Sequence, residues 1–298
     1  MPVRSRPQEG REIRLRPSVA RRRRRLASLA ALALVVAPAY CSQSSESKPT
    51  AESKTGGRLV IAIVYDNNPF DPQLGTAWGF ACVVQGLPET ILFDTGGDGH
   101  LLLANMAKCK IDPKDIGAVV ISHIHSDHLG GLGAFLRANP KVRVFLPKAF
   151  PQKPKQQVRD AGATLVETQR PAKICNGAWT TGVLDGGIPE QGLYVKGAHG
   201  LIVMTGCAHP GIVRMVEAAK QHARLPVHAV LGGFHMGGAS RRRIAEVIAA
   251  LKRLGVGQVA PCHCSGEVTR QMISEAFGDD YLPSGVGARL AFDAVRQE

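Results

Sequence analysis

Four side chains that can bind metal ions lie within six residues of one another: His123, His125, Asp127 and His128. They directly follow the apolar, β-branched run 117–122, so they stand at the end of a predicted strand. Residues two apart in an extended chain point to the same side, so His123 and His125 can hold one cation together. Asp127 and His128 follow and can serve a second cation nearby. A histidine-rich surface turn is the alternative, but such a turn rarely collects three imidazoles and a carboxylate.

Three later segments repeat this arrangement of a strand that ends in a metal-capable side chain. Cys207 and His209 follow the run 200–204, and His235 follows the run 227–232. His263 follows the run 256–260. Its neighbours Cys262 and Cys264 alternate with it, so we expect both to face the opposite side as core residues rather than ligands. Asp94 closes an earlier strand in the same way.

The elements that must position these residues can be predicted from periodicity. Hairpins followed by β–α units favour two mixed sheets with helices on their outer faces, so ligands that follow strands should converge at one edge. We treat 58–298 as one domain, with a less regular stretch at 148–190. The predicted strands are 59–65, 79–84, 89–93, 117–122, 142–146, 192–196, 200–204, 227–232, 256–260 and 286–292, and the predicted helices are 101–110, 132–138, 212–223, 240–254 and 267–277.

The first 57 residues do not have the composition of a folded domain. An arginine-rich segment precedes the 14-residue apolar run 26–39, which is about 21 Å long as a helix and too short to span a membrane. We predict a signal peptide over 1–39 and a flexible polar tether over 40–57. The protein should then be exported, to the periplasm or the outer surface of the cell membrane, with Cys41 as a candidate lipid anchor. An uncleaved membrane anchor or an upstream start site are the alternatives.

The charge of the chain gives no reason to expect nucleic-acid binding. Residues 1–25 carry a net charge of +8, which leaves only +5 of the total of +13 for the rest. The seven cysteines do not form a disulfide framework, since three of them cluster near histidines. Arginines 241–243, which follow Ser240, suit either a substrate phosphate at a helix start or, more commonly, a solvated helix face.

Taken together, these motifs resemble the metallo-β-lactamase superfamily. The resemblance rests on Phe93-Asp-Thr-Gly96, the 123–128 cluster and the later histidines, and it covers nearly all of 58–298. Within the superfamily, Gly206-Cys-Ala-His-Pro-Gly211, Gly232-Gly-Phe-His235 and Pro261-Cys-His-Cys-Ser-Gly266 are similar to a subgroup that contains the dihydropterin ribofuranosyl-aminobenzene phosphate synthase-like proteins. The resemblance implies an α+β fold, a four-layer αββα sandwich with a one- or two-metal hydrolytic centre.

The resemblance also implies a ligand set. His123, His125 and His209 would hold the first cation, and Asp127, His128 and His263 the second. Asp94 would support the ligands rather than bind metal. Cys207 stands where many members have a bridging aspartate, so it is either a thiolate ligand or a small buried residue. His235 could bind substrate, move a proton, ligate metal or simply be packed.

The sequence therefore predicts a metal-dependent hydrolase that uses a metal-activated hydroxide on an ester, amide or phosphoester bond of a small molecule. Asp127 would orient the hydroxide, and His235 could donate a proton to the leaving group. One or two divalent ions are expected, with Zn²⁺ favoured over Mn or Fe. A non-catalytic exported metal- or ligand-binding protein is the alternative, and β-lactam hydrolysis is disfavoured because the subgroup motifs differ from those of the lactamases. The substrate and the oligomeric state do not follow from the sequence.

Overall fold

The computed structural model describes residues 57–295. The predicted signal peptide and all of the tether except its last residue lie outside these residues, as does Cys41. Export and lipid attachment therefore stay predictions. Within the described residues, no helix is both long enough and apolar enough to cross a membrane.

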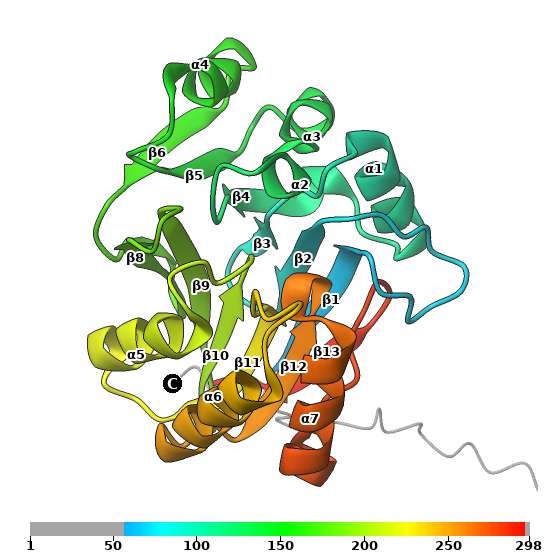
Figure 1. The fold of residues 1–298 in the computed structure, drawn as a ribbon. Helices are drawn as coiled ribbons and strands as arrows, with labels where there is room; N and C mark the ends of the chain where they lie inside the picture. The colour runs from blue at the N-terminus through cyan, green and yellow to red at the C-terminus, as the bar shows by residue number, and fades with distance from the viewer. Residues whose placement is uncertain (1–56, 296–298) are drawn as a thin grey trace, which may run out of the picture. The chain divides into compact units, whose positions relative to one another are not determined.

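The described residues form two mixed β-sheets that lie face to face (Figure 1). The first sheet has the order β13-β1-β2-β3-β4-β5-β6, antiparallel from β13 to β3 and parallel from β3 to β6. Its strands are β1 (Arg58–Asp66), β2 (Phe80–Gln85), β3 (Thr90–Phe93), β4 (Ile116–Val120), β5 (Arg143–Pro147), β6 (Thr164–Thr168) and β13 (Arg289–Asp293).

The second sheet has the order β12-β11-β10-β9-β8-β7. Strands β10, β11 and β12 run parallel to one another, and the remaining pairs are antiparallel. Its strands are β7 (Lys173–Cys175), β8 (Ala178–Leu184), β9 (Glu190–Gly197), β10 (Gly200–Thr205), β11 (Val227–Gly233) and β12 (Gln258–Cys262).

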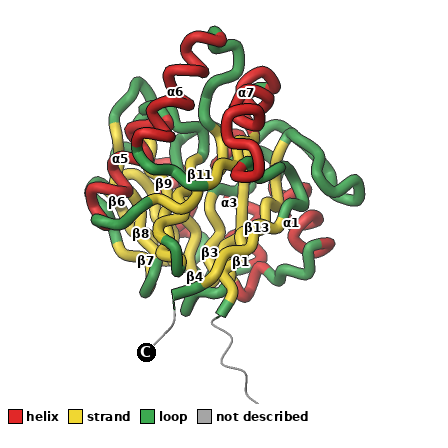
Figure 2. The backbone as a smooth tube through the Cα atoms, turned by 90° about the horizontal axis from the view of Figure 1, so that it is seen from below, coloured by secondary structure: helices red, strands yellow, loops and turns green. Residues whose placement is uncertain are grey.

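Helices cover the outer face of each sheet, and Figure 2 shows the strands gathered between them. Helices α1 to α4 follow strands of the first sheet, and α5 to α7 follow strands of the second. The helices are α1 (Gly99–Lys108), α2 (Ser126–Leu129), α3 (Leu132–Ala138), α4 (Gln152–Asp160), α5 (Ile212–Ala223), α6 (Arg241–Arg253) and α7 (Glu267–Phe277), with short 3₁₀ turns at Pro113–Asp115, His263–Ser265 and Gly278–Asp280.

Alternation along the strands explains why the chain forms four layers. In β1, Ile61 and Ile63 face the core between the sheets, whereas Ala62 and Val64 face the helical layer. A sheet that is apolar on both faces has to be covered on both. The helices supply the complementary stripes, such as Ile244, which is buried on α6 together with the residues three, four and seven positions later. The observed architecture is the predicted four-layer αββα sandwich.

The predicted elements are confirmed except in one region. Helices α3, α5 and α7 have the predicted bounds, and the other predicted elements agree to within about three residues. The stretch 148–190, predicted to be less regular, contains α4 and strands β6 to β8.

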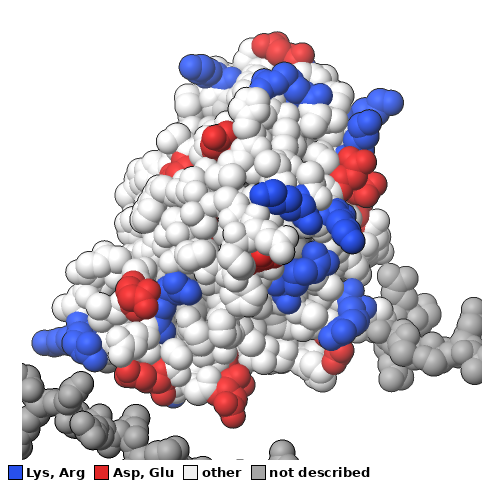
Figure 3. Space-filling view, turned by 90° about the vertical axis from the view of Figure 1, so that its right-hand side faces the viewer, with Lys and Arg blue, Asp and Glu red and all other residues white. Residues whose placement is uncertain are grey.

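Figure 3 shows basic and acidic side chains interspersed on one face, without a continuous basic surface.

Candidate metal centre

The metal-capable side chains lie where parallel strands end, at one edge of the two sheets. In the first sheet, the loop after β4 carries the 123–128 cluster. In the second sheet, Cys207 and His209 follow β10, His235 follows β11, and His263 follows β12. Since the carboxyl ends of neighbouring parallel strands share an edge, residues more than 100 positions apart in the chain come together there.

A first group consists of His123, His125 and His209, whose candidate ligand atoms all lie within 4.8 Å of one another. His123 Nε2 is 3.1 Å from His125 Nδ1 and 3.3 Å from His209 Nε2. The hydroxyl oxygen of Ser122 is 2.9 Å from His123 Nδ1 and can accept a hydrogen bond from its N–H, which leaves Nε2 with a free lone pair. Three imidazole nitrogens therefore point at a common position.

A second group consists of Asp127, His128 and His263. His128 Nε2 and His263 Nε2 are 3.2 Å apart, and Asp127 Oδ2 lies 3.5 and 3.4 Å from these two nitrogens. His263 Nδ1 faces the side-chain oxygen of Asn67 at 2.9 Å, so its proton lies there and its Nε2 carries the lone pair. Two imidazole lone pairs and a carboxylate oxygen converge on a second position.

Asp94 supports both groups from a fully buried position without belonging to either. Its Oδ2 lies 2.7 Å from His128 Nδ1 and accepts a hydrogen bond of the same length from the Ser122 hydroxyl, which in turn contacts His123. Its Oδ1 accepts the Ser122 backbone N–H at 2.7 Å. One carboxylate thus orients an imidazole of each group, the arrangement that fixes ring tautomers in metal sites.

The protonation states of the histidine rings are consistent with a cation-binding site. Burial and the neighbouring imidazoles hold the pKa of His123 far below its usual range, so this ring is neutral. Burial, His235 and His125 likewise lower the pKa of His209 to about 4. Burial alone would lower the pKa of His128, but Asp94 and Asp127 raise it to about 10, so a cation at the second group must displace a proton. The neutral imidazoles of the first group, and those of the second once His128 has lost this proton, present converging lone pairs that suit a divalent cation.

Cys207 lies at the centre of the site. It is buried, and its Sγ is 3.2 Å from His128 Nε2. With His123 and His128 it forms a further set of candidate ligands within 4.8 Å of one another. Of the two readings of this residue, the position between the two groups favours the thiolate ligand over a residue buried beneath the site.

His235 and Cys264 also reach the site. His235 is exposed at its rim, with its ring centroid 4.3 Å from that of His209, so it is not a packed core histidine. Cys264 was expected to face the opposite side from His263, and this prediction is wrong: its Sγ lies within 4.8 Å of the ligand atoms of His263 and Cys207. His263 has a φ of 49°, in the left-handed region, and begins a 3₁₀ turn, so the two-residue alternation of the strand ends before it.

Two buried carboxylates that the sequence analysis missed hold the ligand loops. Glu190, the first residue of β9, accepts the backbone N–H groups of Cys207, Ala208 and His209 at 3.0, 2.9 and 2.8 Å. Burial raises the pKa of Glu190, whereas these hydrogen bonds lower it, and the effect of burial is the larger. Asp66, the last residue of β1, accepts the backbone N–H of His263 at 3.1 Å. Asp66 ends a strand just as Asp94 does, a signal that could have identified it.

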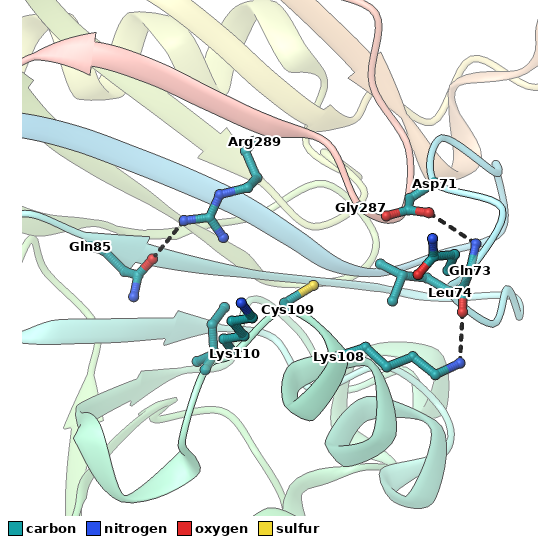
Figure 4. Close-up of a pocket in the computed structure, with 10 residues that line it drawn as sticks. Asp71, Gln73, Leu74, Gln85, Lys108, Cys109, Lys110, Gly287 and Arg289 are labelled. Atoms are coloured by element: carbon teal, nitrogen blue, oxygen red, sulfur yellow. Dashed lines mark hydrogen bonds between the residues drawn. The ribbon is translucent and has the colours of Figure 1, made fainter.

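Three further features lie outside the ligand groups. Trp78 is 60% exposed, and its ring centroid is 5.0 Å from that of His263, which places an aromatic face at the rim of the site. A separate cavity of about 450 Å³ is lined by Lys108, Lys110 and Arg289, and none of the histidines of the centre lines it (Figure 4). Arginines 242 and 243 are exposed and pair with Glu246, which agrees with a solvated helix face.

Comparison with known proteins agrees with this fold. The family model described as the metallo-β-lactamase superfamily matches residues 81–209. The 7,8-dihydropterin-6-methyl-4-(β-D-ribofuranosyl)-aminobenzene-5′-phosphate synthase of Methanocaldococcus jannaschii is 31% identical over 271 residues, which cover 76% of this chain and 92% of that protein. The crystal structure of Tm1679, a metal-dependent hydrolase of the β-lactamase superfamily, matches 78% of this chain and 98% of its own at 27% identity, with a TM-score of 0.65. YhfI from Bacillus subtilis, at 12% identity, covers 79% of this chain and 99% of its own with a TM-score of 0.61, a likeness of fold.

Proposed function

This chain belongs to the metallo-β-lactamase superfamily, and from that membership we propose that it is a metal-dependent hydrolase acting on an ester, amide or phosphoester bond of a small molecule. The observation that carries the proposal is the pair of three-residue groups, each with its lone pairs converging on one position. Both groups have all three of their ligand residues, which favours catalysis over a non-catalytic binding role. The name of the 27% identical structure, a metal-dependent hydrolase, supports the same class.

The donor set suggests which cations the protein uses. Five imidazoles and one carboxylate make up the two groups, and Cys207 adds a thiol between them. Nitrogen donors with a thiolate suit Zn²⁺, whereas Mn²⁺ prefers oxygen. We therefore propose Zn²⁺ as the native cation, with Fe and Mn as the alternatives to be tested.

Divalent cations, when bound there, would lower the pKa of a water molecule and polarise the oxygen of the bond to be cleaved. The side chains of the protein supply the rest of the chemistry. Asp127 is 19% exposed and touches both imidazoles of the second group, so it can orient the attacking water and take its proton. His235 is exposed beside His209 and can donate a proton to the leaving group.

A panel of chromogenic phosphodiester, lactone and β-lactam substrates tests this proposal on protein loaded with Zn²⁺ or Mn²⁺. We expect one bond class to be hydrolysed, activity to be lost with a chelator, and activity to return with metal. Asp127→Asn should lower kcat by roughly 10²–10⁴-fold, the range of a general acid–base group. His235→Ala should slow substrates with a poor leaving group more than those with a nitrophenolate. His199→Ala, which changes an exposed histidine elsewhere, is the matched control.

Stoichiometric, tight metal binding without turnover of any of these substrates would replace the proposal with a metal-binding role. Synthase activity is the second candidate, because the 31% identical relative is named as a synthase. Chromatographic detection of the product in that name, from the corresponding pterin and ribofuranosyl-aminobenzene substrates, would favour it.

A further inference from the structure

The cavity shown in Figure 4 lies against the first sheet, and none of the residues of the metal centre lines it. Its volume of about 450 Å³ falls within the range of small-molecule sites, roughly 300–1,000 Å³. On the sheet, Arg289 of β13 is paired with Ala62 of β1, which faces the helical layer, so the arginine points to that same side. The end of α1 and the loop after β1 form the other walls.

The lining of this cavity carries an excess of positive charge. Lys108, Lys110 and Arg289 all line it, and Asp71 is the one acidic residue among its lining residues. Three positive charges and one negative charge leave a net charge of +2. In the described part of the chain, none of the three basic side chains forms an ion pair. Their charge is therefore not neutralised by the protein itself.

The hydrogen bonds of these side chains hold them in place and leave donors over. Lys108 Nζ donates to the backbone oxygen of Gln73 at 2.6 Å, and the Arg289 guanidinium donates to the side-chain oxygen of Gln85 at 3.4 Å. Both acceptors are neutral, and an ammonium and a guanidinium each have further N–H groups. A guanidinium can place two of its N–H groups on the oxygens of one phosphate.

The backbone at the end of α1 indicates that the second lysine has a purpose. The N–H groups of Lys110 and Ile111 bond to the carbonyl oxygens of Ala107 and Met106 at 3.0 and 2.9 Å, the pattern of a Schellman motif. Glycine usually occupies the left-handed position of this motif, but here it is Lys110, with a φ of 58°. The helix dipole favours basic residues near a C-terminus, yet it does not explain a lysine in place of glycine, nor Arg289 on the facing strand.

The half-buried thiol of Cys109 lies in the same lining, between Arg289 and Lys110 in Figure 4. Burial raises the pKa of this thiol, Arg289 lowers it and Asp71 raises it, so both charged groups act on the sulfur. The thiol is thus a chemical reporter inside the cavity. Among the other cysteines of the described residues, only Cys175 is not buried.

We propose that this cavity binds a small organic phosphate, with the phosphate group against Arg289 and Lys110. Hydroxyl groups of the same molecule can donate to the carboxylate of Asp71 and to the side-chain oxygen of Gln73, which also line the cavity. Such a ligand matches both the excess of basic groups and the acceptors beside them. The site is separate from the metal centre, so the proposal does not depend on the hydrolytic activity.

Alkylation of Cys109 in the metal-loaded full chain tests the charge of the cavity first. Labelling rates with anionic iodoacetate and neutral iodoacetamide are measured at Cys109 and Cys175 by peptide mass spectrometry. The ratio of the two rates cancels the thiolate fraction of each cysteine. We expect this ratio to be about threefold or more higher at Cys109, and the difference to shrink at high salt. A ratio no higher than that at Cys175 would contradict the positive potential on which the proposal rests.

Protection of Cys109 from iodoacetamide then measures binding, with glucose 6-phosphate as the probe. Glucose 6-phosphate should slow the labelling at millimolar concentrations, whereas glucose should not. Lys110→Gly, which suits the left-handed turn, and Arg289→Gln should each weaken this binding about fivefold or more. Arg242→Gln, which changes an exposed arginine on α6, is the matched control and should leave it unchanged.

Three outcomes of the protection experiment would overturn the proposal. They are no protection by glucose 6-phosphate, equal protection by glucose, and unchanged affinity in both cavity variants. Tricarballylate, a tricarboxylate, separates phosphate from carboxylate ligands, and protection by it at least as strong as that by glucose 6-phosphate would refute the phosphate assignment. Since labelling at Cys109 is measured without turnover, these results are independent of whether the metal centre hydrolyses any substrate.

Discussion

The carboxylate of Glu190 is the support whose removal should be most informative. It is fully buried, and it holds the loop of Cys207 and His209 through three backbone N–H donors. Two of these donors bond to Oε1 and one, the N–H of His209, bonds to Oε2. In Glu190→Gln the amide oxygen can keep the first two bonds, but the NH₂ group then faces the His209 N–H and cannot accept it.

The expected loss of stability in Glu190→Gln follows from this single N–H without an acceptor. One buried N–H left without a partner costs about 1–3 kcal/mol, and this is the expected loss in the free energy of unfolding of the metal-free protein. Since His209 is a candidate ligand and its backbone would shift, metal affinity should also fall, by roughly 10–100-fold as for other supporting residues. A tenfold rise in Kd removes about 1.4 kcal/mol of the stabilisation that saturating metal gives.

Chemical unfolding of Glu190→Gln, with a chelator and with saturating Zn²⁺, measures both quantities, and chelator competition gives Kd directly. Glu89→Gln is the matched control, because Glu89 is only half-buried and pairs with Arg143 at the surface, where a lost ion pair costs about 0–1 kcal/mol. If Glu190→Gln unfolds and binds metal like the wild type, the loop does not depend on this carboxylate, and the reasoning fails.

Three further predictions concern ligands, packing and pH. His123→Ala and His263→Ala should each lower the bound metal by about one ion per chain and abolish turnover, as metal analysis and assay would reveal; retained activity would mean that the centre is misassigned. Gly206→Ala should destabilise the protein by about 1–3 kcal/mol in chemical unfolding, because the new methyl group overlaps the Ser122 hydroxyl and lies 2.8 Å from Asp94 Oδ2, whereas Gly117→Ala should be close to neutral. Burial raises the pKa of Tyr194 from 10.0 to about 12, so the folded protein keeps a proton that the unfolded chain releases, and stability should fall as pH rises from about 10 to 12. The stability of Tyr194→Phe should decline less steeply over that range. An equal slope in the variant and the wild type would contradict the raised pKa of Tyr194.

Most of the fold could be predicted because its signals are local. Strands buried on both faces appear as continuous apolar runs, and α5, α6 and α7 have strong 3.6-residue patterns, so their positions follow from the sequence. The stretch 148–190 gave weaker signals. Strand β6 carries polar residues at an edge of the first sheet, β7 has only three residues, and α4 contains an internal proline and no continuous apolar stripe. Tertiary packing rather than local pattern determines these elements.

The ligands, like most of the elements, have local sequence patterns, whereas the residues that support them depend on tertiary packing. The cluster 123–128 is recognisable because its spacing is itself the geometry of a metal site. His209 and His263 are recognisable because they follow predicted strands, and the resemblance to a known family assigned each of them to a ligand group. Glu190 and Cys264 have no such local pattern. Glu190 accepts N–H groups 17 to 19 residues later in the chain, and Cys264 contacts Cys207, which precedes it by 57 residues. A left-handed residue at the end of β12 turns Cys264 toward the centre, and the alternation rule cannot anticipate such a residue when it is not glycine. Cys207 and Cys264 are therefore recognisable as neighbours only when the ends of β10, β11 and β12 are assembled.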